Sequence, residues 1–213
     1  DGLVRASAPT GRTALVGDVL TRLATPPEHE EAQLALSRLL AAQGRYDESA
    51  RLALTLLQRQ PGHVPALEQL ASVLSDTGDA DRLAPVVARL RLGAPNQAAT
   101  HYYAATLAYL QGRPETAVRD ADAALALDPR HARARNLLGA ALASLGQRER
   151  ARAAFTASLE ADPRDPATYS NLATLELESG NADAAHRYFA EALTLDPDND
   201  VARKGLAATL ARP

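Results

Sequence analysis

Apolar residues recur along most of the chain at intervals of three and four, in short stretches that are broken by glycine or proline. One such set is Leu67, Leu70, Ala71 and Leu74, and another is Ala185, Phe189, Ala192 and Leu193. Residues three or four apart lie on the same face of an α-helix, so each stretch predicts a short helix with one apolar face. The pattern therefore predicts a succession of amphipathic helices.

Glycine and proline divide this succession at a regular step of 34 residues. The prolines of the series are Pro27, Pro61, Pro95, Pro129, Pro163 and Pro197, and the glycines are Gly44, Gly78, Gly112, Gly146 and Gly180. Proline ends a helix because it lacks an amide hydrogen and disfavours the helical conformation of the residue before it. Glycine ends the other helix of each period, where the backbone must become left-handed at little cost. Every period is therefore predicted to be a helical hairpin.

The hairpins at residues 132–165 and 166–199 share further motifs. These are a first-helix turn (Asn136, Leu138 and Gly139; Asn171, Leu172 and Ala173), a small residue opening the second helix (Ala151; Ala185), an aromatic residue (Phe155; Phe189) and a terminal Asp-Pro pair (Asp162 and Pro163; Asp196 and Pro197). With these motifs the chain resembles the tetratricopeptide repeat family over residues 30–213. The resemblance implies an all-α fold, a right-handed superhelical solenoid of tandem helix-turn-helix repeats. The alternative is another helical-hairpin repeat of the same period.

One hairpin cannot bury its apolar face alone, so neighbouring hairpins are expected to stack into a continuous core. We expect five repeats, at 30–63, 64–97, 98–131, 132–165 and 166–199, and a C-terminal capping helix at 200–213. Residues 1–29 are expected to be a linker and a helix, which is either the remnant of a degenerate repeat or a helix packed on the end of the array. The second repeat departs from the pattern, because Leu83 replaces the small residue and Pro85 falls inside its second helix. That helix is expected to start late or to bend, and the array to be irregular there.

Composition narrows the choice of function without naming one. The chain is 46% hydrophobic and 23% charged, has a net charge of −3 and contains no cysteine, which removes disulfides, thiolate zinc sites and thiol nucleophiles. We attribute the dominance of arginine over lysine to a GC-rich, bacterial genome. Since the chain contains no methionine, we expect it to be a piece of a longer polypeptide. No segment has the length and hydrophobicity of a membrane span or a signal peptide, and the cytoplasm and the periplasm both stay open.

No group of residues in the sequence has the spacing of a catalytic, cofactor or metal site. Phosphate-binding loops, the serine-hydrolase elbow and the zinc-protease motif are all missing from it. His29, His63 and His131 share one slot of the repeat, but turns one repeat apart are too distant to hold a common zinc ion. They are interpreted as surface turn residues. We therefore expect no enzyme activity, no cofactor and no metal.

The resemblance implies that the first helices of the repeats line a concave groove, which holds a peptide or helix of a partner protein. The expected groove residues are Arg38, Glu68, Asp76, Tyr102, Thr106, Tyr109, Arg133, Asn136, Ser170, Thr174 and Glu178. Tyr102 and Tyr109 share a face of one helix, and an aromatic pair beside Arg133 is typical of a binding hot spot. The alternative is that one or both tyrosines pack between helices. The lysine and asparagine set that binds chaperone tails in this family is not assembled, because Lys204 is the only lysine.

Charge is distributed unevenly along the C-terminal half of the chain. Residues 130–152 contain six arginines against one glutamate, whereas residues 156–200 contain ten acidic residues against two arginines. This polarity could orient a partner or drive self-association, or it reflects solvated helix faces. Nucleic-acid binding is not expected at a net charge of −3. The sequence thus favours a protein-interaction module with an adaptor or scaffold role, and the alternative is the non-catalytic arm of a larger enzyme.

Overall fold

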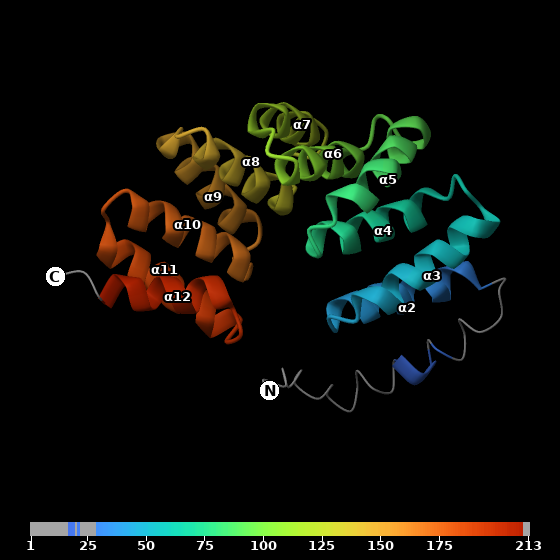
Figure 1. The fold of residues 1–213 in the computed structure, drawn as a ribbon, viewed down its shortest axis with the longest axis horizontal. Coiled ribbons are helices and arrows are strands. Elements are labelled where there is room, and N and C mark those ends of the chain that lie inside the picture. The colour runs from blue at the N-terminus through green and yellow to red at the C-terminus, as the bar shows by residue number, and fades with distance from the viewer. Residues whose placement is uncertain (1–16, 20, 22–28, 211–213) are drawn as a thin grey trace. The chain divides into compact units, whose positions relative to one another are not determined.

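The structure is a computed structural model that describes residues 17–19, 21 and 29–210, and these residues form helices joined by short turns. The helices are α2 (Glu30–Ala42), α3 (Tyr46–Arg59), α4 (Val64–Asp76), α5 (Ala80–Gly93), α6 (Ala98–Leu110), α7 (Pro114–Leu127), α8 (Ala132–Ser144), α9 (Arg148–Ala161), α10 (Pro166–Glu178), α11 (Ala182–Leu195) and α12 (Asp200–Leu210) (Figure 1). The described part of the chain contains no strand. The expected all-α class is confirmed. Most of the linker and helix expected at 1–29 lies outside the described residues, as do residues 211–213 of the capping helix.

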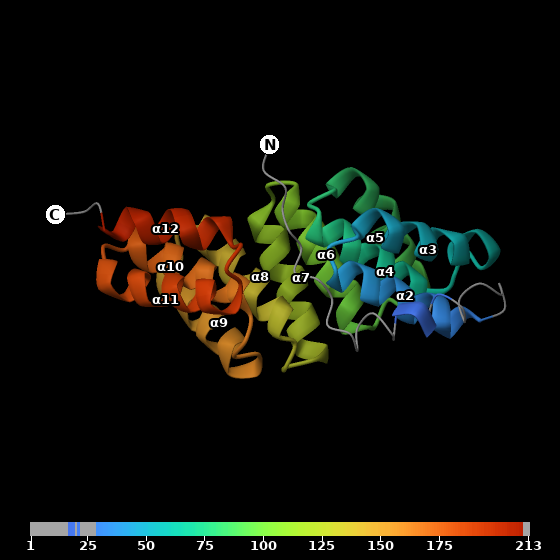
Figure 2. The ribbon, with the colours of Figure 1, turned by 90° about the horizontal axis from the view of Figure 1, so that it is seen from below.

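The chain divides into two compact units, Asp1–Pro95 and Asn96–Pro213. In the first unit α3 packs on both α2 and α4, and α5 packs on α4. In the second unit each helix packs on the next, and α6, α8, α10 and α12 also contact one another in turn. Figure 2 shows α10, α11 and α12 packed together from a second direction. The division between the units falls at Pro95, in the segment where the sequence departs from the repeat.

The turns follow the glycine and proline series read from the sequence. The glycines of the series have φ values of 73° at Gly44, 69° at Gly78, 68° at Gly112, 71° at Gly146 and 86° at Gly180, so the predicted left-handed turns are confirmed. The second helices end two residues before the prolines. At three of these ends the residue after the helix is an aspartate in an extended conformation. At Asp128, for example, the side-chain Oδ1 accepts a hydrogen bond from the N–H of Arg130 at 3.0 Å. The aspartate therefore starts the turn that the proline completes.

The helix that contains Pro85 is expected from the sequence to start late or to bend, and it does not start late. Helix α5 begins at Ala80, in step with the other second helices, and Pro85 lies within it. Asp79 precedes the helix, and its side chain accepts the N–H of Arg82 at 3.0 Å. This cap supplies an acceptor that one of the free amides of the first turn needs. The proline five residues further on therefore does not delay the start of α5.

Histidine has a capping role that the sequence did not reveal. The Nδ1 atoms of His63 and His131 accept the N–H groups of Ala66 and Ala134, each at 3.2 Å, at the starts of α4 and α8. Both rings are half-buried. The interpretation of these two residues as surface turn residues is therefore corrected: they are N-caps. The ring must be neutral at Nδ1 to accept the amide.

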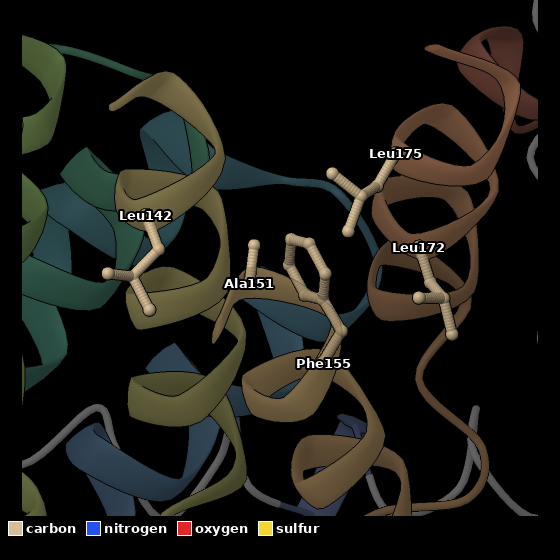
Figure 3. Packing of buried hydrophobic residues seen from close by; sticks show 5 residues of the cluster. All are labelled: Leu142, Ala151, Phe155, Leu172 and Leu175. Atoms are coloured by element: carbon tan, nitrogen blue, oxygen red, sulfur yellow. The ribbon is translucent and has the colours of Figure 1, made fainter. Parts of the chain in front are cut away.

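In the core of the second unit, an aromatic ring of one helix packs against a small residue of another. Phe155 of α9 is 1% exposed and contacts Leu142 and Ala151 on one side and Leu172 and Leu175 of α10 on the other (Figure 3). Its ring lies directly against the backbone of Gly139 in α8, where an added Cβ would be 2.6 Å from two ring carbons. Phe189 of α11 closes in the same way on Gly205 of α12. Glycine thus sets how closely two helices approach.

A buried polar contact joins α9, α10 and the turn after α10. Glu176 is 5% exposed, and its carboxylate accepts hydrogen bonds from the guanidinium of Arg152 and, at 2.6 Å, from the side-chain amide of Asn181. The bond from Arg152 lowers the pKa of Glu176 more than burial raises it, and Asn181 lowers it further. Glu176 is therefore held as an anion in the folded chain, which fixes the register between neighbouring repeats.

We predict that Gly139→Ala destabilises the full chain although alanine is ordinarily the better helix former. The new methyl group must displace the buried ring of Phe155, which costs about 1–3 kcal/mol of unfolding free energy. Urea denaturation followed by circular dichroism measures the loss. Gly93→Ala is the matched control, because its Cβ would lie 3.6 Å from the nearest atom and so fits. Equal stability of the two variants would show that the ring does not need this glycine.

We also predict that Glu176→Gln lowers the unfolding free energy by about 1–3 kcal/mol at neutral pH, since Arg152 then lacks its anionic partner. The pKa of Glu176 is lower in the folded than in the unfolded chain, so its stabilisation is present above about pH 4.3. It disappears as the pH falls through the folded pKa, and the difference between wild type and variant should shrink in acid. Denaturation at several pH values measures this. The control is Glu178→Gln, exposed on the same helix, which should change stability by under about 0.5 kcal/mol.

Candidate functional site

The expected groove residues lie on the first helices of the hairpins, in both units. In the first unit, Arg38 is exposed on α2, Glu68 is half-buried on α4 and Asp76 is exposed at the end of α4. Burial raises the pKa of Glu68, and the positive charge of Arg38 opposes that effect. The fold therefore brings Arg38 and Glu68 into electrostatic contact, while Asp76 lies further along the same helix as Glu68.

The other expected residues lie on α6, α8 and α10 of the second unit. At the start of α8, the guanidinium carbon of Arg133 lies 5.5 Å from the centre of the Tyr102 ring, which is within cation–π distance. Tyr102 is only 7% exposed and also packs on Tyr103 and His131, with ring centres 5.1 and 4.9 Å away. Tyr102 is therefore a packing residue that supports Arg133. Arg133 itself is exposed.

His131 completes this corner of the unit. Burial lowers its pKa most, the carboxylate of Asp128 opposes that shift, and the charge of Arg133 lowers the pKa further. The neutral ring that results is the form that caps α8. The side chain of His131 thus links its own protonation state to the start of α8 and to the position of Arg133.

A pair of asparagines joins α8 and α10. The Nδ2 of Asn171 donates to the Oδ1 of Asn136 at 2.9 Å, and both side chains are half-buried. This contact leaves the Nδ2 of Asn136 and the Oδ1 of Asn171 unused, because each amide has more bonding capacity than the contact takes. Asn136 was expected from the sequence and Asn171 was missed. The signal for Asn171 was its place in the first-helix motif, which was assigned only to the fold.

Three of the expected hydroxyl groups are already used inside their helices. Thr106 donates to the Tyr102 carbonyl at 3.0 Å, Ser170 to the Pro166 carbonyl at 3.0 Å and Thr174 to the Ser170 carbonyl at 2.8 Å. Thr106 and Ser170 are 8% and 3% exposed. Of these three, only Thr174 reaches the surface.

A hollow of about 230 Å³ opens between α6, α8 and α10. It is lined by Tyr109 of α6, by Ala140, Ala143 and Ser144 of α8, by Phe155 of α9, and by Asn171, Thr174, Leu175 and Glu178 of α10. The fold therefore brings together three expected residues, Tyr109, Thr174 and Glu178, that lie on two different helices. The apolar floor of the hollow, formed in part by Phe155, was not foreseen.

Other kinds of site are not apparent in the described residues. Between residues 29 and 210 and in the helical stretch before them, no three or more His, Cys, Asp or Glu side chains are grouped as a metal ion would need. Where helices are described, none has the length and apolar character needed to cross a membrane. The face formed by α6, α8 and α10 is therefore the candidate functional site.

Comparison with known proteins gives the family. Sequence profiles described as tetratricopeptide repeat match residues 12–64 and 102–166, and a further one matches 166–199. No curated protein matches the sequence significantly. Among solved structures, a thermophilic TPR protein of Thermus thermophilus is 26% identical with a TM-score of 0.75, covering 86% of this chain and 100% of that one.

Two other solved structures share the fold at lower identity. YrrB, described as a TPR protein with an unusual peptide-binding site, is 17% identical with a TM-score of 0.53 over 88% of this chain and 97% of its own. A MamA fragment from Desulfovibrio magneticus RS-1 is 20% identical with a TM-score of 0.56 over 80% of this chain and 97% of its own. The profile matches cover more than half of the chain. The chain therefore belongs to the tetratricopeptide repeat family, whose members are in general protein-interaction modules.

Proposed function

We propose that the second unit binds a peptide segment of a partner protein across α6, α8 and α10. The binding face consists of Tyr109, Arg133, Asn136, Asn171, Thr174 and Glu178. The observation that carries this proposal is the Asn136–Asn171 pair, with Nδ2 and Oδ1 2.9 Å apart, between the exposed Arg133 and the hollow beside Tyr109. The chain acts by binding rather than by catalysis.

The asparagine pair suits the main chain of a peptide. A peptide group has one N–H donor and one C=O acceptor, and the pair has one carbonyl oxygen and one amide nitrogen left to meet them. Because the two amides already hold each other, little side-chain entropy is lost when a ligand binds. Recognition of the main chain would be independent of the ligand's sequence, so specificity must come from the residues on either side.

Arg133 and Tyr109 supply that specificity. Arginine and tyrosine are enriched among residues that dominate binding energy at protein interfaces. Arg133 is held over the ring of Tyr102, so its guanidinium is oriented before a ligand arrives. Tyr109 forms one wall of the hollow and is half-buried. YrrB, which shares the fold and is described as having an unusual peptide-binding site, supports the choice of a peptide as ligand.

We further propose an adaptor role in which the first unit offers a second contact region at Arg38, Glu68 and Asp76. The charges there are of both signs, and burial raises the pKa of Glu68. A group that is already partly desolvated needs to lose less water when a partner covers it. Two contact regions on one chain would allow two partners, or two segments of one partner, to be held together. Nucleic acid is not proposed as a ligand, since the net charge is −3.

Selection of random twelve-residue peptides displayed on phage, with the full chain immobilised, tests the binding face. We predict that the selected peptides lose about tenfold or more in affinity for the double variant Arg133→Glu, Asn136→Ala. Arg148→Glu is the matched control for charge reversal, because Arg148 is exposed at the start of α9, outside the face. The helical circular-dichroism signal should be unchanged in both variants. Undiminished binding by the double variant would rule out this face.

The pKa of His131 gives a second test of the corner around Arg133. In NMR titration His131 should have a pKa below the ordinary value of about 6.5, and Arg133→Gln should raise it by removing a nearby positive charge. Because the folded pKa is the lower one, stabilisation by the neutral ring is present above about pH 6.5 and is lost as pH falls through the folded pKa. Arg130→Gln, exposed in the preceding turn, is the control. An unchanged pKa in Arg133→Gln would mean that the two side chains are not coupled.

A further inference from the structure

We infer that the hollow beside Tyr109 takes a basic side chain, lysine or arginine, of the peptide ligand. This inference rests on the proposed function and adds the chemistry of one ligand position. It depends on the shape of the hollow, on the charge around its rim and on its distance from Arg133.

The hollow has the size and the walls for the aliphatic part of a single long side chain. Its volume of about 230 Å³ is below the roughly 300–1,000 Å³ of pockets that hold whole small-molecule ligands. Ala140, Ala143 and Leu175 provide apolar walls, and the buried Phe155 also lines the hollow. Lysine and arginine cover apolar surface with their methylene groups while the charged end stays at the rim.

The one charged side chain among the described residues that line the hollow is acidic. Glu178, the last residue of α10, lines it and is exposed, and no described residue forms an ion pair with its carboxylate. The C-terminal ends of α6, α8 and α10 are all close by, at Tyr109, Ser144 and Glu178, and none of these helices has a basic residue in its last turn. Helix C-termini carry partial negative charge that a cation normally offsets. A basic side chain of the ligand would offset both the helix ends and Glu178.

Tyr109 adds a second attraction for a cation. Its ring forms one wall of the hollow, and aromatic faces attract guanidinium and ammonium groups within about 6 Å. A neutral apolar side chain would fill the same volume but would leave Glu178 uncompensated. An acidic side chain would be repelled by the rim. The hollow therefore discriminates by charge among side chains of similar length.

The position of Arg133 sets a spacing for the ligand. Arg133 is the second residue of α8 and Ser144 is its last, so about 16 Å of helix separates them at 1.5 Å per residue. An extended peptide advances about 3.3 Å per residue and covers that length in about five residues. A ligand with its basic residue in the hollow can therefore place an acidic residue on Arg133 about five positions away.

The peptides selected on the full chain provide the first readout. We expect lysine or arginine to be enriched at one aligned position, with acidic residues enriched about five positions away. Selection on Glu178→Gln should weaken the basic preference, because the hollow then lacks its carboxylate. Glu160→Gln is the matched control, because Glu160 is an exposed acid on α9 that does not line the hollow, and it should keep the preference.

Affinities of one selected peptide and its norleucine analogue give the second readout. Norleucine keeps the methylene groups of lysine and lacks the ammonium group. For wild type and Glu160→Gln we expect the analogue to bind about three- to tenfold more weakly than the lysine peptide. For Glu178→Gln this difference should become smaller, because only the helix ends and Tyr109 still attract the ammonium group.

The outcomes separate this inference from the proposed function. Peptides that depend on Arg133 and Asn136 but show no basic preference would overturn the inference and leave the binding face in place. So would a norleucine penalty that is as large in Glu178→Gln as in wild type. If no peptide is selected, or if binding ignores Arg133→Glu, the proposed function fails and the inference fails with it.

Discussion

The proposed binding face depends on how closely a ring on one helix approaches the backbone of another. Phe155 of α9 lies against Gly139 of α8, and the same ring contacts Leu172 and Leu175 of α10. One side chain thus spaces three helices, and it also lines the hollow. Because cores pack at near-crystalline density, any shift of this ring would move the walls of the hollow as well. The proposed ligand recognition would therefore be coupled to stability at this position.

The fold could be anticipated because each of its signals is local. The left-handed turns at Gly44 and the glycines in its series, and the helix ends before the prolines, each depend on the conformation of one or two residues. The places of Ala151 and Phe155 in the second helix of their hairpin could be predicted from the repeat period. Pro85 is the exception: it predicts a late start or a bend, whereas α5 begins at Ala80, in step with the other second helices.

The candidate site was anticipated only in part, because its features depend on how separate helices meet. The contact between Asn136 and Asn171 joins residues 35 positions apart, and neither the distance nor the pairing is visible in a sequence pattern. The burial of Tyr102 has the same origin, since His131 and Arg133 cover its ring from the next repeat. Hydroxyl groups such as that of Ser170 were expected to face a ligand, yet each had a backbone carbonyl one turn away. Helical periodicity predicts the face on which a residue lies. It does not predict which group forms a hydrogen bond with the polar atoms of its side chain.

The closing helix has a consequence for anyone who wants to divide this chain into smaller pieces. Gly205 of α12 receives the ring of Phe189, which is 1% exposed, and Ala202 of the same helix is fully buried beside it. A fragment that ends at Pro197 would keep every hairpin but would expose that phenylalanine to water. The exposed hydrophobic surface would promote association with another molecule. The smallest self-sufficient piece of the second unit therefore extends through Leu210. Its boundary is set by the ring that must be covered and not by the count of repeats.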